Sequence, residues 1–383
     1  LEPTGTRRFD GGRWELRARA TGATSKIREG DLVLASDGDP VGGEAELARV
    51  ERLGDEVVVT ADERVDLRRL DVYPSEFGVD RQLNALAEFV LKGDPRRKDV
   101  LFGREAPAFD EDGERVENPG AYVPTNEAQD RAVRRALAAE DFALVHGPPG
   151  TGKTYAIARL VRALVERGDR VLLSAYTNRA VDNAVEALVS QGFDDVVRVG
   201  TESGVGESVE RFRLPRRGDP AELADRLRSA PVVAATTSTA GSRAMRELDF
   251  DVAVVDEASQ LTEPATLAAI NRADRFVLVG DHRQLPPVVR AENGLARSVF
   301  ERLIDAHPDA SVTLDRQYRM AQAIQAFPSR EFYDGALRPA TPEVAGQRID
   351  ELADAGALPP EIRSSVSFVH VDGDHEAHSD ARE

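Results

Sequence analysis

The chain has 383 residues, a formal net charge of −18 and a pI of about 4.9, and 41% of its residues are hydrophobic. That length allows two or three domains with buried cores. Cysteine is absent, which excludes disulfides, iron–sulfur clusters and thiolate zinc sites within these residues, and the six histidines lack metal-ligand spacing. No apolar run approaches the roughly 18 residues of a membrane span and no signal peptide is visible, so we expect no membrane partner and a cytoplasmic location.

The kind of charge is as informative as its amount. A strongly acidic chain is unusual for a nucleic-acid binder, which normally carries a basic surface. Of the 50 Lys and Arg residues only four are lysines, which leaves 46 arginines. Abundant acid with few lysines is typical of halophilic proteins, in which high salt screens the self-repulsion. An ordinary acidic protein of a GC-rich genome is the alternative, and Lys153 stands out as one of the few retained lysines.

The first part of the chain, residues 1–75, is expected to form a small β-barrel that serves as an accessory domain. Short apolar stretches at 31–35 and 56–60 predict strands, and Asp37-Gly38 and Gly42-Gly43 predict turns between strands. A barrel of this size can bind nucleic acid or act as a spacer, and the sequence leaves both open.

A stalk helix and a linker are expected over residues 76–120. Apolar residues at helical spacing predict a helix over 80–93, which Gly93 ends. Residues 103–123 are acidic and rich in turn formers, which is typical of a linker.

Residues 121–310 alternate between apolar strands and amphipathic helices. Thr125 or Asn126 can cap the first helix. This alternation predicts an α/β fold with a mostly parallel sheet that binds ligands at the carboxyl ends of its strands. We expect strands at 142–146, 170–176, 196–199, 232–235, 252–255 and 276–279, and helices at 153–167, 179–190 and 221–228.

A glycine-rich stretch between the strand at 142–146 and the next helix fits the pattern G-x-x-x-x-G-K-[ST]. Strand, loop and helix in that order are the context of a phosphate-binding loop, in which backbone N–H groups and the helix N-terminus converge on phosphate oxygens. We expect Lys153 at the β/γ phosphates and the Thr154 hydroxyl on Mg²⁺. A chance match is the alternative, and the flanking elements disfavour it. The loop consists of Gly147, Pro148, Pro149, Gly150, Thr151, Gly152, Lys153 and Thr154.

Two later strands also end in polar residues. The apolar run from Asp251 delivers Asp256, which can hold Mg²⁺ opposite Thr154, and Glu257, which can orient and deprotonate the attacking water. A solvated acidic turn is the alternative. The strand at 276–279 leads to Gln284, which can sense the γ-phosphate and link the nucleotide state to neighbouring loops.

Four stretches together resemble the superfamily 1 helicases: 147–154, Asp256-Glu-Ala-Ser-Gln260, Gly280-Asp-His-Arg-Gln-Leu-Pro-Pro287 and Gln317-Tyr-Arg-Met320. They are similar to the branch that holds the nonsense-mediated-decay RNA helicase, the immunoglobulin-switch-region-binding helicase and the replicative nuclease-helicase. The wording of residues 174–183 is closest to the nuclease-helicase. The resemblance implies a RecA-like P-loop NTPase fold and covers about half of the chain, in the order that the family shows.

Site residues follow from this resemblance. It implies that Gln129 reads adenine, that Tyr318 stacks on adenine, and that Arg319 reaches the γ-phosphate from a second motor domain. An arginine of that kind accelerates hydrolysis about 10³–10⁵-fold. Short polar side chains at the sheet edge are implied to hold the phosphates of a single strand, with helix or turn capping as the alternative. These residues are Thr177, Asn178, Thr236, Thr237 and Ser238.

The resemblance implies an ATP-dependent, Mg²⁺-dependent 5′→3′ helicase that moves on single-stranded nucleic acid, with DNA favoured over RNA. Residues 311–383 correspond to only part of a second RecA-like motor domain, and the chain begins at Leu1, so we expect a piece of a longer protein that can also carry a nuclease domain. The alternatives are a strand-stimulated ATPase that remodels protein–RNA complexes, and a nucleotide-dependent strand-binding module with little turnover. From the piece alone we expect ATP binding, weak hydrolysis and no processive unwinding.

Overall fold

The structure is a computed structural model that describes residues 1–8, 13–21, 27–40, 42–72, 76–110, 126–215, 218–289 and 294–348. The chain divides into two compact units, Leu1–Asp80 and Arg81–Glu383. No helix among the described residues is long and apolar enough to cross a membrane. The part of the expected linker beyond residue 110 and the cap expected from Thr125 lie outside the described residues.

The first unit is a six-stranded sheet in which every strand pair is antiparallel. Alternate side chains of its strands point into one small core, which includes Leu16, Val33, Ala48 and Val59. The strands expected at 31–35 and 56–60 are present as β3 and β5. In the order β1-β2-β5-β4-β3-β6 the strands are β1 Glu2–Arg8, β2 Trp14–Arg19, β5 Glu56–Ala61, β4 Ala45–Arg52, β3 Leu32–Ser36 and β6 Arg69–Val72.

The second unit is built on a seven-stranded sheet whose strand pairs are all parallel. Its central strands are buried along almost their whole length, which explains their continuous runs of Val, Leu and Ala. Because the strands are parallel, their carboxyl ends form one edge, and the predicted site residues follow these ends. In sheet order the strands are β13 Ser311–Thr313, β7 Phe142–His146, β12 Ala273–Gly280, β11 Phe250–Asp256, β8 Val171–Ala175, β10 Val232–Thr236 and β9 Val196–Val199.

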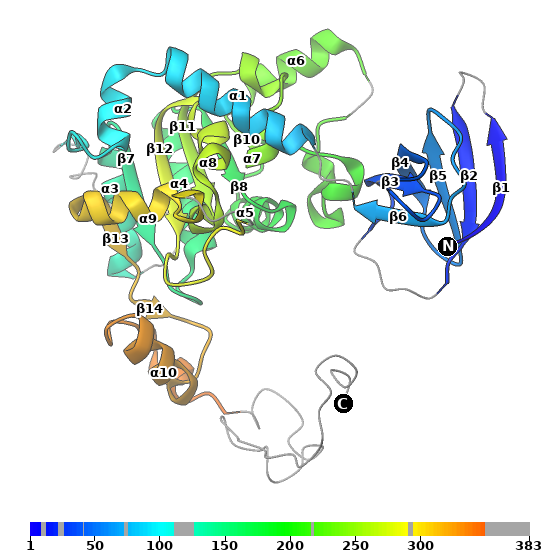
Figure 1. Ribbon diagram of the computed structural model, residues 1–383. Coiled ribbons are helices and arrows are strands. Elements are labelled where there is room, and N and C mark those ends of the chain that lie inside the picture. Colours follow the sequence, from blue (N-terminus) through cyan, green and yellow to red (C-terminus); the bar gives the residue numbers. More distant parts are fainter. Residues whose placement is uncertain are drawn as a thin grey trace. The chain divides into compact units, whose positions relative to one another are not determined.

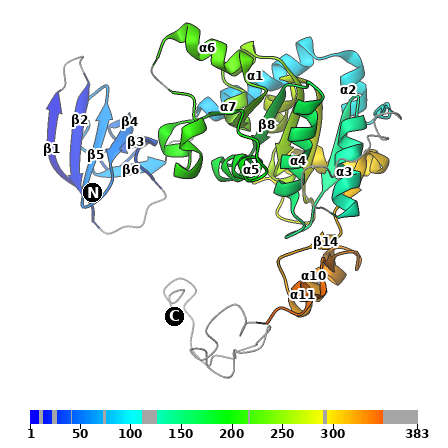
Figure 2. The same ribbon diagram turned by 180° about the vertical axis from the view of Figure 1, so that it is seen from behind.

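Helices cover both faces of this sheet, which gives two hydrophobic layers (Figures 1 and 2). One face carries α3 Glu127–Ala138, α4 Lys153–Glu166 and α5 Asn178–Ser190. The other face carries α1 Glu76–Lys92, α2 Pro95–Leu101, α7 Thr237–Ala240, α8 Glu263–Ile270 and α9 Val299–Ala306. The sequence predicted α1 but not the short α2, which begins at a Pro and is capped by Asp94.

The rest of the second unit is made of short elements. Helix α6 Pro220–Ser229 precedes β10, and short 3₁₀ segments lie at Glu202–Gly204, Glu207–Phe212, Met245–Glu247, Ala258–Gln260, Gly294–Ala296 and Pro308–Ala310. After the sheet come a two-stranded parallel pair, β14 Arg316–Gln317 and β15 Arg338–Pro339, and the helices α10 Gln322–Phe332 and α11 Pro342–Ala345.

Strand β13 differs from the sequence-based expectation. The sequence predicts that a second motor domain begins at residue 311. In the structure, Ser311–Thr313 instead pair in parallel with Leu144–His146 and complete the seven-stranded sheet. A three-residue strand carries no local sign of its partner, because the pairing joins segments about 167 residues apart. Thr313 is therefore the last residue of the seven-stranded sheet along the chain.

Candidate nucleotide site

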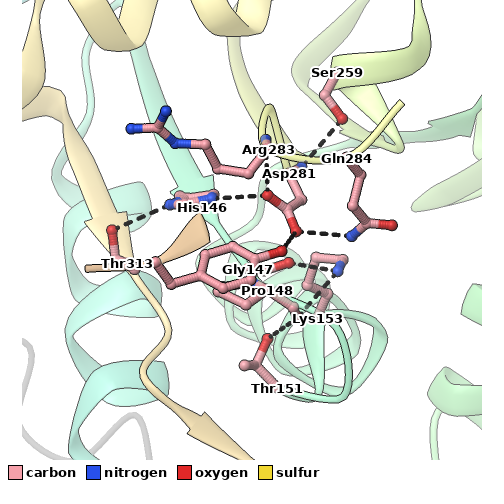
Figure 3. A network of polar contacts seen from close by, with 11 residues as sticks. His146, Gly147, Pro148, Thr151, Lys153, Ser259, Asp281, Arg283, Gln284 and Thr313 are labelled. Carbon is pink, nitrogen blue, oxygen red and sulfur yellow. Dashed lines mark hydrogen bonds and ion pairs between the residues drawn. The ribbon is translucent and has the colours of Figure 1, made fainter. Parts of the chain in front are cut away.

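The glycine-rich loop 147–154 connects β7 to α4, as the sequence predicts. Gly147 N–H donates to the Gly280 carbonyl at the end of β12, over 2.9 Å, which ties the loop to the neighbouring strand. The Lys153 ammonium donates to the carbonyls of Gly147 at 2.5 Å and Pro148 at 3.4 Å (Figure 3). Burial lowers the pKa of Lys153, and the nearby carboxylate of Asp256 opposes that effect. A half-buried ammonium held by neutral carbonyls is available to an anion that enters the loop.

Two glycines of the loop are required by its geometry. Gly150 and Gly152 both have a φ of +77°, a left-handed conformation that glycine adopts without strain. A Cβ at Gly150 would lie 2.8 Å from the Cβ of Arg319, and one at Gly152 would lie 2.7 Å from Nε2 of Gln129. The loop therefore approaches Gln129 on one side and Arg319 on the other, closer than any side chain would allow.

Asp256 and Glu257 lie at the carboxyl end of β11, between β12 and β8. Asp256 is 6% exposed and accepts a hydrogen bond from Glu257 N–H at 2.8 Å. Burial raises the pKa of Asp256 to about 6, although this hydrogen bond and Lys153 both act to lower it. Glu257 has a φ of 54°, and left-handed backbone at a non-glycine residue costs free energy and clusters at functional sites.

Asp281, directly after β12, is the centre of a buried polar network (Figure 3). Its carboxylate contacts His146 Nε2 at 3.0 Å and accepts hydrogen bonds from Gln284 Nε2 at 2.7 Å and from the Tyr333 hydroxyl at 2.7 Å. Burial acts to raise the pKa of Asp281, but the hydrogen bonds outweigh it and lower the pKa to about 2. Gln284, the expected sensor, is thus held by a carboxylate that the sequence-based reasoning did not assign to the site.

The two residues implied for adenine recognition both contact the glycine-rich loop. Asn126 caps α3 by accepting from Gln129 N–H at 2.9 Å, and its Nδ2 donates to the Tyr318 hydroxyl at 2.8 Å. Gln129 is 2% exposed and donates to the Thr151 carbonyl at 3.0 Å, while Tyr318 N–H donates to the Gly150 carbonyl at 2.9 Å. The structure therefore brings Gln129 and Tyr318 together around the loop.

Arg319 follows Tyr318 and lies beside the loop as well. Gln317 is fully buried, and its Oε1 accepts from Arg319 N–H at 2.9 Å, which fixes the backbone of this segment. The positive charge of Arg319 is close enough to lower the pKa of Lys153. Two cations thus lie at one loop, an arrangement suited to a polyanionic phosphate chain.

The residues implied to hold a strand follow β8. Thr177 caps α5 by accepting from Ala180 N–H at 3.1 Å, and its hydroxyl donates to Glu257 Oε2 at 3.3 Å. Asn178 Oδ1 accepts from the Arg198 guanidinium at 2.9 Å. The capping alternative describes Thr177, whereas the side chain of Asn178, the first residue of α5, is held by Arg198 of β9.

The corresponding residues after β10 have partners of their own. Thr236 caps α7 by accepting from Thr239 N–H at 3.2 Å. Ser238 is exposed, and Arg81 donates to its hydroxyl at 3.1 Å and to its carbonyl at 3.0 Å. Thr237 is only 3% exposed and is the least accessible of the five. Their carboxyl-end position agrees with the sequence-based expectation, and a role in strand binding stays a prediction.

A buried ion pair lies beneath Asn178, and the sequence did not reveal it. Arg198 on β9 is fully buried and donates to Asp182 Oδ1 at 2.8 Å and to the Val199 carbonyl at 2.7 Å. Asp182 Oδ2 accepts from Gly206 N–H at 2.9 Å, which joins the loop after β9 to α5. The only sequence sign was a charged residue inside an apolar strand.

The residues suited to a divalent cation are Thr154 and Asp256. Both supply oxygen atoms, the ligands that Mg²⁺ prefers, and Mg²⁺ in nucleotide sites takes one or two protein ligands together with phosphate oxygens and waters. Among the described residues there is no group of three or more His, Cys, Asp or Glu that could hold a metal ion alone. The donor set therefore fits Mg²⁺ bound together with a nucleotide.

Comparison with known proteins agrees with this geometry. Residues 124–220 and 216–292 match one family model described as an AAA domain, and residues 295–383 match a second model of the same description. A DNA replication ATP-dependent helicase/nuclease of Arabidopsis thaliana is 36% identical over 319 residues, which cover 79% of this chain and 24% of that protein. An uncharacterized ATP-dependent helicase of Methanocaldococcus jannaschii is 29% identical, over 82% of this chain and 61% of that protein.

Two further proteins are similar to parts of this chain. A DNA replication ATP-dependent helicase/nuclease of Saccharomyces cerevisiae is 35% identical over 270 residues, 66% of this chain and 17% of that protein. The solved arterivirus nonstructural protein 10, a helicase, gives a TM-score of 0.41 at 16% identity and covers 86% of this chain and 58% of that one. The chain thus spans about a quarter or less of the length of the plant and yeast relatives.

Proposed function

Because the chain belongs to the superfamily 1 helicases related to the DNA replication helicase/nucleases, we propose that it hydrolyses ATP and couples hydrolysis to movement on single-stranded DNA. The observation that carries the proposal is the convergence of Lys153, Asp256 and Arg319 at one glycine-rich loop. Among the residues that the structure describes, no specific contact favours the alternative roles as a remodelling ATPase or as a strand-binding module with little turnover.

The proposed reaction begins when the phosphates of ATP enter loop 147–154. Lys153 exchanges its carbonyl contacts for β/γ-phosphate oxygens, and Arg319 stabilises the charge that develops on the transferred phosphoryl group. Glu257 orients the attacking water and accepts its proton. Gln129 and Tyr318 are proposed to hold the adenine ring, which makes ATP the favoured nucleotide.

Mg²⁺, held by Thr154 and Asp256 together with the phosphates, would neutralise charge on the β and γ oxygens. Asp256 serves this role as a carboxylate, and the pKa of about 6 leaves it mostly ionised at neutral pH. Gln284 is proposed to sense the γ-phosphate, for which it must exchange its contact with Asp281. That exchange would transmit nucleotide state to the network of His146 and Tyr333.

The ATPase assignment is tested with Lys153→Ala and with Lys92→Ala as the matched control, since Lys92 is an exposed lysine in the last turn of α1. We expect Lys153→Ala to abolish ATP hydrolysis in the presence of single-stranded DNA and Lys92→Ala to keep it. Hydrolysis retained by Lys153→Ala would refute the assignment.

A single strand is proposed to cross the sheet edge at Thr177, Asn178, Thr236, Thr237 and Ser238, with DNA favoured and 5′→3′ movement. The support is the position of these residues after the neighbouring strands β8 and β10, and the relatives named as DNA replication enzymes. Oligodeoxynucleotides and oligoribonucleotides of equal length, compared as stimulators of hydrolysis, discriminate the substrate. Substrates with 5′ or 3′ tails, unwound by the whole parent protein, test the polarity.

We propose a first motor domain from residue 121, with its border moved from 310 to Thr313 because β13 pairs with β7. Residues 314–383 would form part of a second motor domain, and 76–120 a stalk and linker. For 1–75 we propose a barrel: the amino group of Leu1, before edge strand β1, donates to the Arg68 carbonyl, before edge strand β6, at 2.7 Å.

The setting of the whole protein is also a proposal. The helicase/nuclease names of the relatives support a nuclease domain elsewhere in the parent chain. The composition, with four lysines among 50 basic residues and no cysteine, supports a cytoplasmic protein of a halophilic prokaryote. For this chain alone we expect ATP binding with weak hydrolysis and no processive unwinding, and robust unwinding of a tailed duplex by this chain would contradict that.

A further inference from the structure

We propose that Thr177 is a positioning residue that withholds Glu257 from the attacking water until a single strand takes its hydroxyl hydrogen bond. The inference rests on the proposed function, since it concerns how strand binding controls the same ATP site. The carrying observation is the hydrogen bond from Thr177 Oγ1 to Glu257 Oε2, at 3.3 Å.

The location of this contact in the sheet is significant. Strands β7, β12 and β11 carry the glycine-rich loop, Gln284 and Glu257, whereas β8 and β10 carry Thr177 and Thr236. The sheet order is β7-β12-β11-β8-β10, so the nucleotide residues and the expected strand residues occupy adjoining halves of one edge. The Thr177–Glu257 hydrogen bond joins the two halves where β11 and β8 pair.

The hydroxyl can serve only one acceptor at a time. A Thr hydroxyl has one proton and two lone pairs. Thr177 Oγ1 accepts from Ala180 N–H at 3.1 Å, and its single proton goes to Glu257. A phosphate oxygen of a bound strand can receive a hydrogen bond from this hydroxyl only if Glu257 gives it up. Strand binding and retention of Glu257 are therefore mutually exclusive at this atom.

Glu257 is suited to being released. Its backbone is left-handed, with a φ of 54°, so its conformation costs free energy that neighbouring contacts must offset. Thr177 lies at the N-terminus of the 13-residue helix α5, where a carboxylate is also stabilised by the helix dipole. A phosphate that occupies this helix end would displace the carboxylate by repulsion as well as by competition, and Glu257 would then turn to the water at the γ-phosphate.

The inference can be tested without hydrolysis. Glu257 and the bound strand compete for the Thr177 hydroxyl, so removal of Glu257 should strengthen strand binding. We would measure the affinity of this chain for a fluorescent oligothymidylate, without nucleotide, for wild type, Glu257→Ala, Thr177→Ala and the double variant. Glu257→Ala should bind the strand about 3- to 10-fold more tightly when Thr177 is present, and the gain should vanish with Thr177→Ala. An equal gain in both backgrounds would mean only the loss of a negative charge and would overturn the inference.

Single-turnover hydrolysis supplies the second readout. Thr177→Ala should raise the rate of ATP hydrolysis without DNA and reduce the stimulation of that rate by DNA. Thr177→Ser keeps the hydroxyl and should behave as wild type. Ser298→Ala is the matched control, because Ser298 caps α9 through a bond of the same 3.1 Å length and lies outside the site. Ser298→Ala should lose stability as Thr177→Ala does and leave the rate of ATP hydrolysis without DNA unchanged.

Full DNA stimulation of hydrolysis in Thr177→Ala would overturn the inference. A wild type that binds no strand and hydrolyses no ATP would instead refute the proposed function itself.

Discussion

The Tyr333 hydroxyl donates a 2.7 Å hydrogen bond to Asp281 Oδ2, which joins the end of α10 to the segment after β12. Burial raises the pKa of Tyr333, and Asp281 raises it further, so the phenol stays protonated as the donor. The same carboxylate contacts His146, the last residue of β7 before the glycine-rich loop, and Gln284. The Asp281 carboxylate thus connects the strand before the glycine-rich loop, the expected sensor Gln284, and Tyr333, which lies beyond the seven-stranded sheet.

Tyr333→Phe should therefore destabilise the chain. The change removes a donor from a buried carboxylate, and a lost hydrogen bond to a charged group costs about 1.5–3 kcal/mol in free energy of unfolding. Chemical denaturation at pH 7 measures the loss. Tyr155→Phe is the control, since none of the hydrogen bonds of the described residues uses the Tyr155 hydroxyl, and it should change stability little. A Tyr333→Phe chain as stable as wild type would show that Asp281 is satisfied without the phenol.

The raised pKa of Asp256 predicts an effect of pH on stability. Its pKa is about 6 in the folded chain and 3.8 for a free carboxyl, so the folded state binds the proton more tightly. The stabilising contribution is complete below pH 3.8 and is lost as the pH rises through about 6. Asp256→Asn has no such titration.

Asp256→Asn should consequently gain stability relative to wild type as the pH rises from about 4 to about 7, by about 1–3 kcal/mol. Denaturation of both proteins at the two pH values, without Mg²⁺ or nucleotide, measures the difference. A pH-independent difference would mean that Asp256 ionises normally in the folded chain. The same variant should bind Mg²⁺ and ATP less tightly at pH 7, because it lacks the carboxylate.

Much of the candidate nucleotide site could be proposed from the sequence because its residues are adjacent in the chain. Lys153 and Thr154 stand in one contiguous pattern, and Asp256 and Glu257 follow one apolar strand, so local chemistry makes them candidates whose roles stay predictions. The sequence pattern also predicted strands β7 to β12 and helices α4 to α6, and it left Thr125 or Asn126 as the cap of α3, which in the structure is Asn126. These features depend on interactions a few residues apart, to which periodicity and capping rules apply.

The remaining features depend on partners that are distant in sequence. Tyr333 acts through Asp281, 52 residues earlier, and no pattern around it marks this contact. Strand β13 belongs to the seven-stranded sheet only because it pairs with β7. The Thr177–Glu257 hydrogen bond spans 80 residues and arises from the strand order, which single-sequence patterns do not determine.

Arg198 and Asp182 should be among the most sensitive residues of the second unit. Their side chains are 0% and 4% exposed, and removal of one member of a buried ion pair leaves an uncompensated charge, at a cost of about 3–5 kcal/mol. Arg198→Met should therefore strongly destabilise the chain in chemical denaturation and, where folded, weaken strand binding through Asn178. Arg228→Met is the control, because the pair of Arg228 and Asp225 is exposed and should contribute less than about 1 kcal/mol. Equal effects of the two variants would contradict the importance of the buried pair.

Salt should stabilise this chain, because its net charge of −18 produces self-repulsion that ions screen. The Debye length falls from about 10 Å at 0.1 M to about 3 Å at 1 M, so most of the gain should occur below about 1 M KCl. Thermal unfolding in increasing KCl measures it, and NaCl at equal ionic strength should act in the same way if screening is the cause. A halophilic protein should unfold at about 0.1 M salt, whereas an acidic protein of a GC-rich genome should stay folded there and gain little. A melting temperature independent of salt would contradict the halophilic interpretation of its many acids and few lysines.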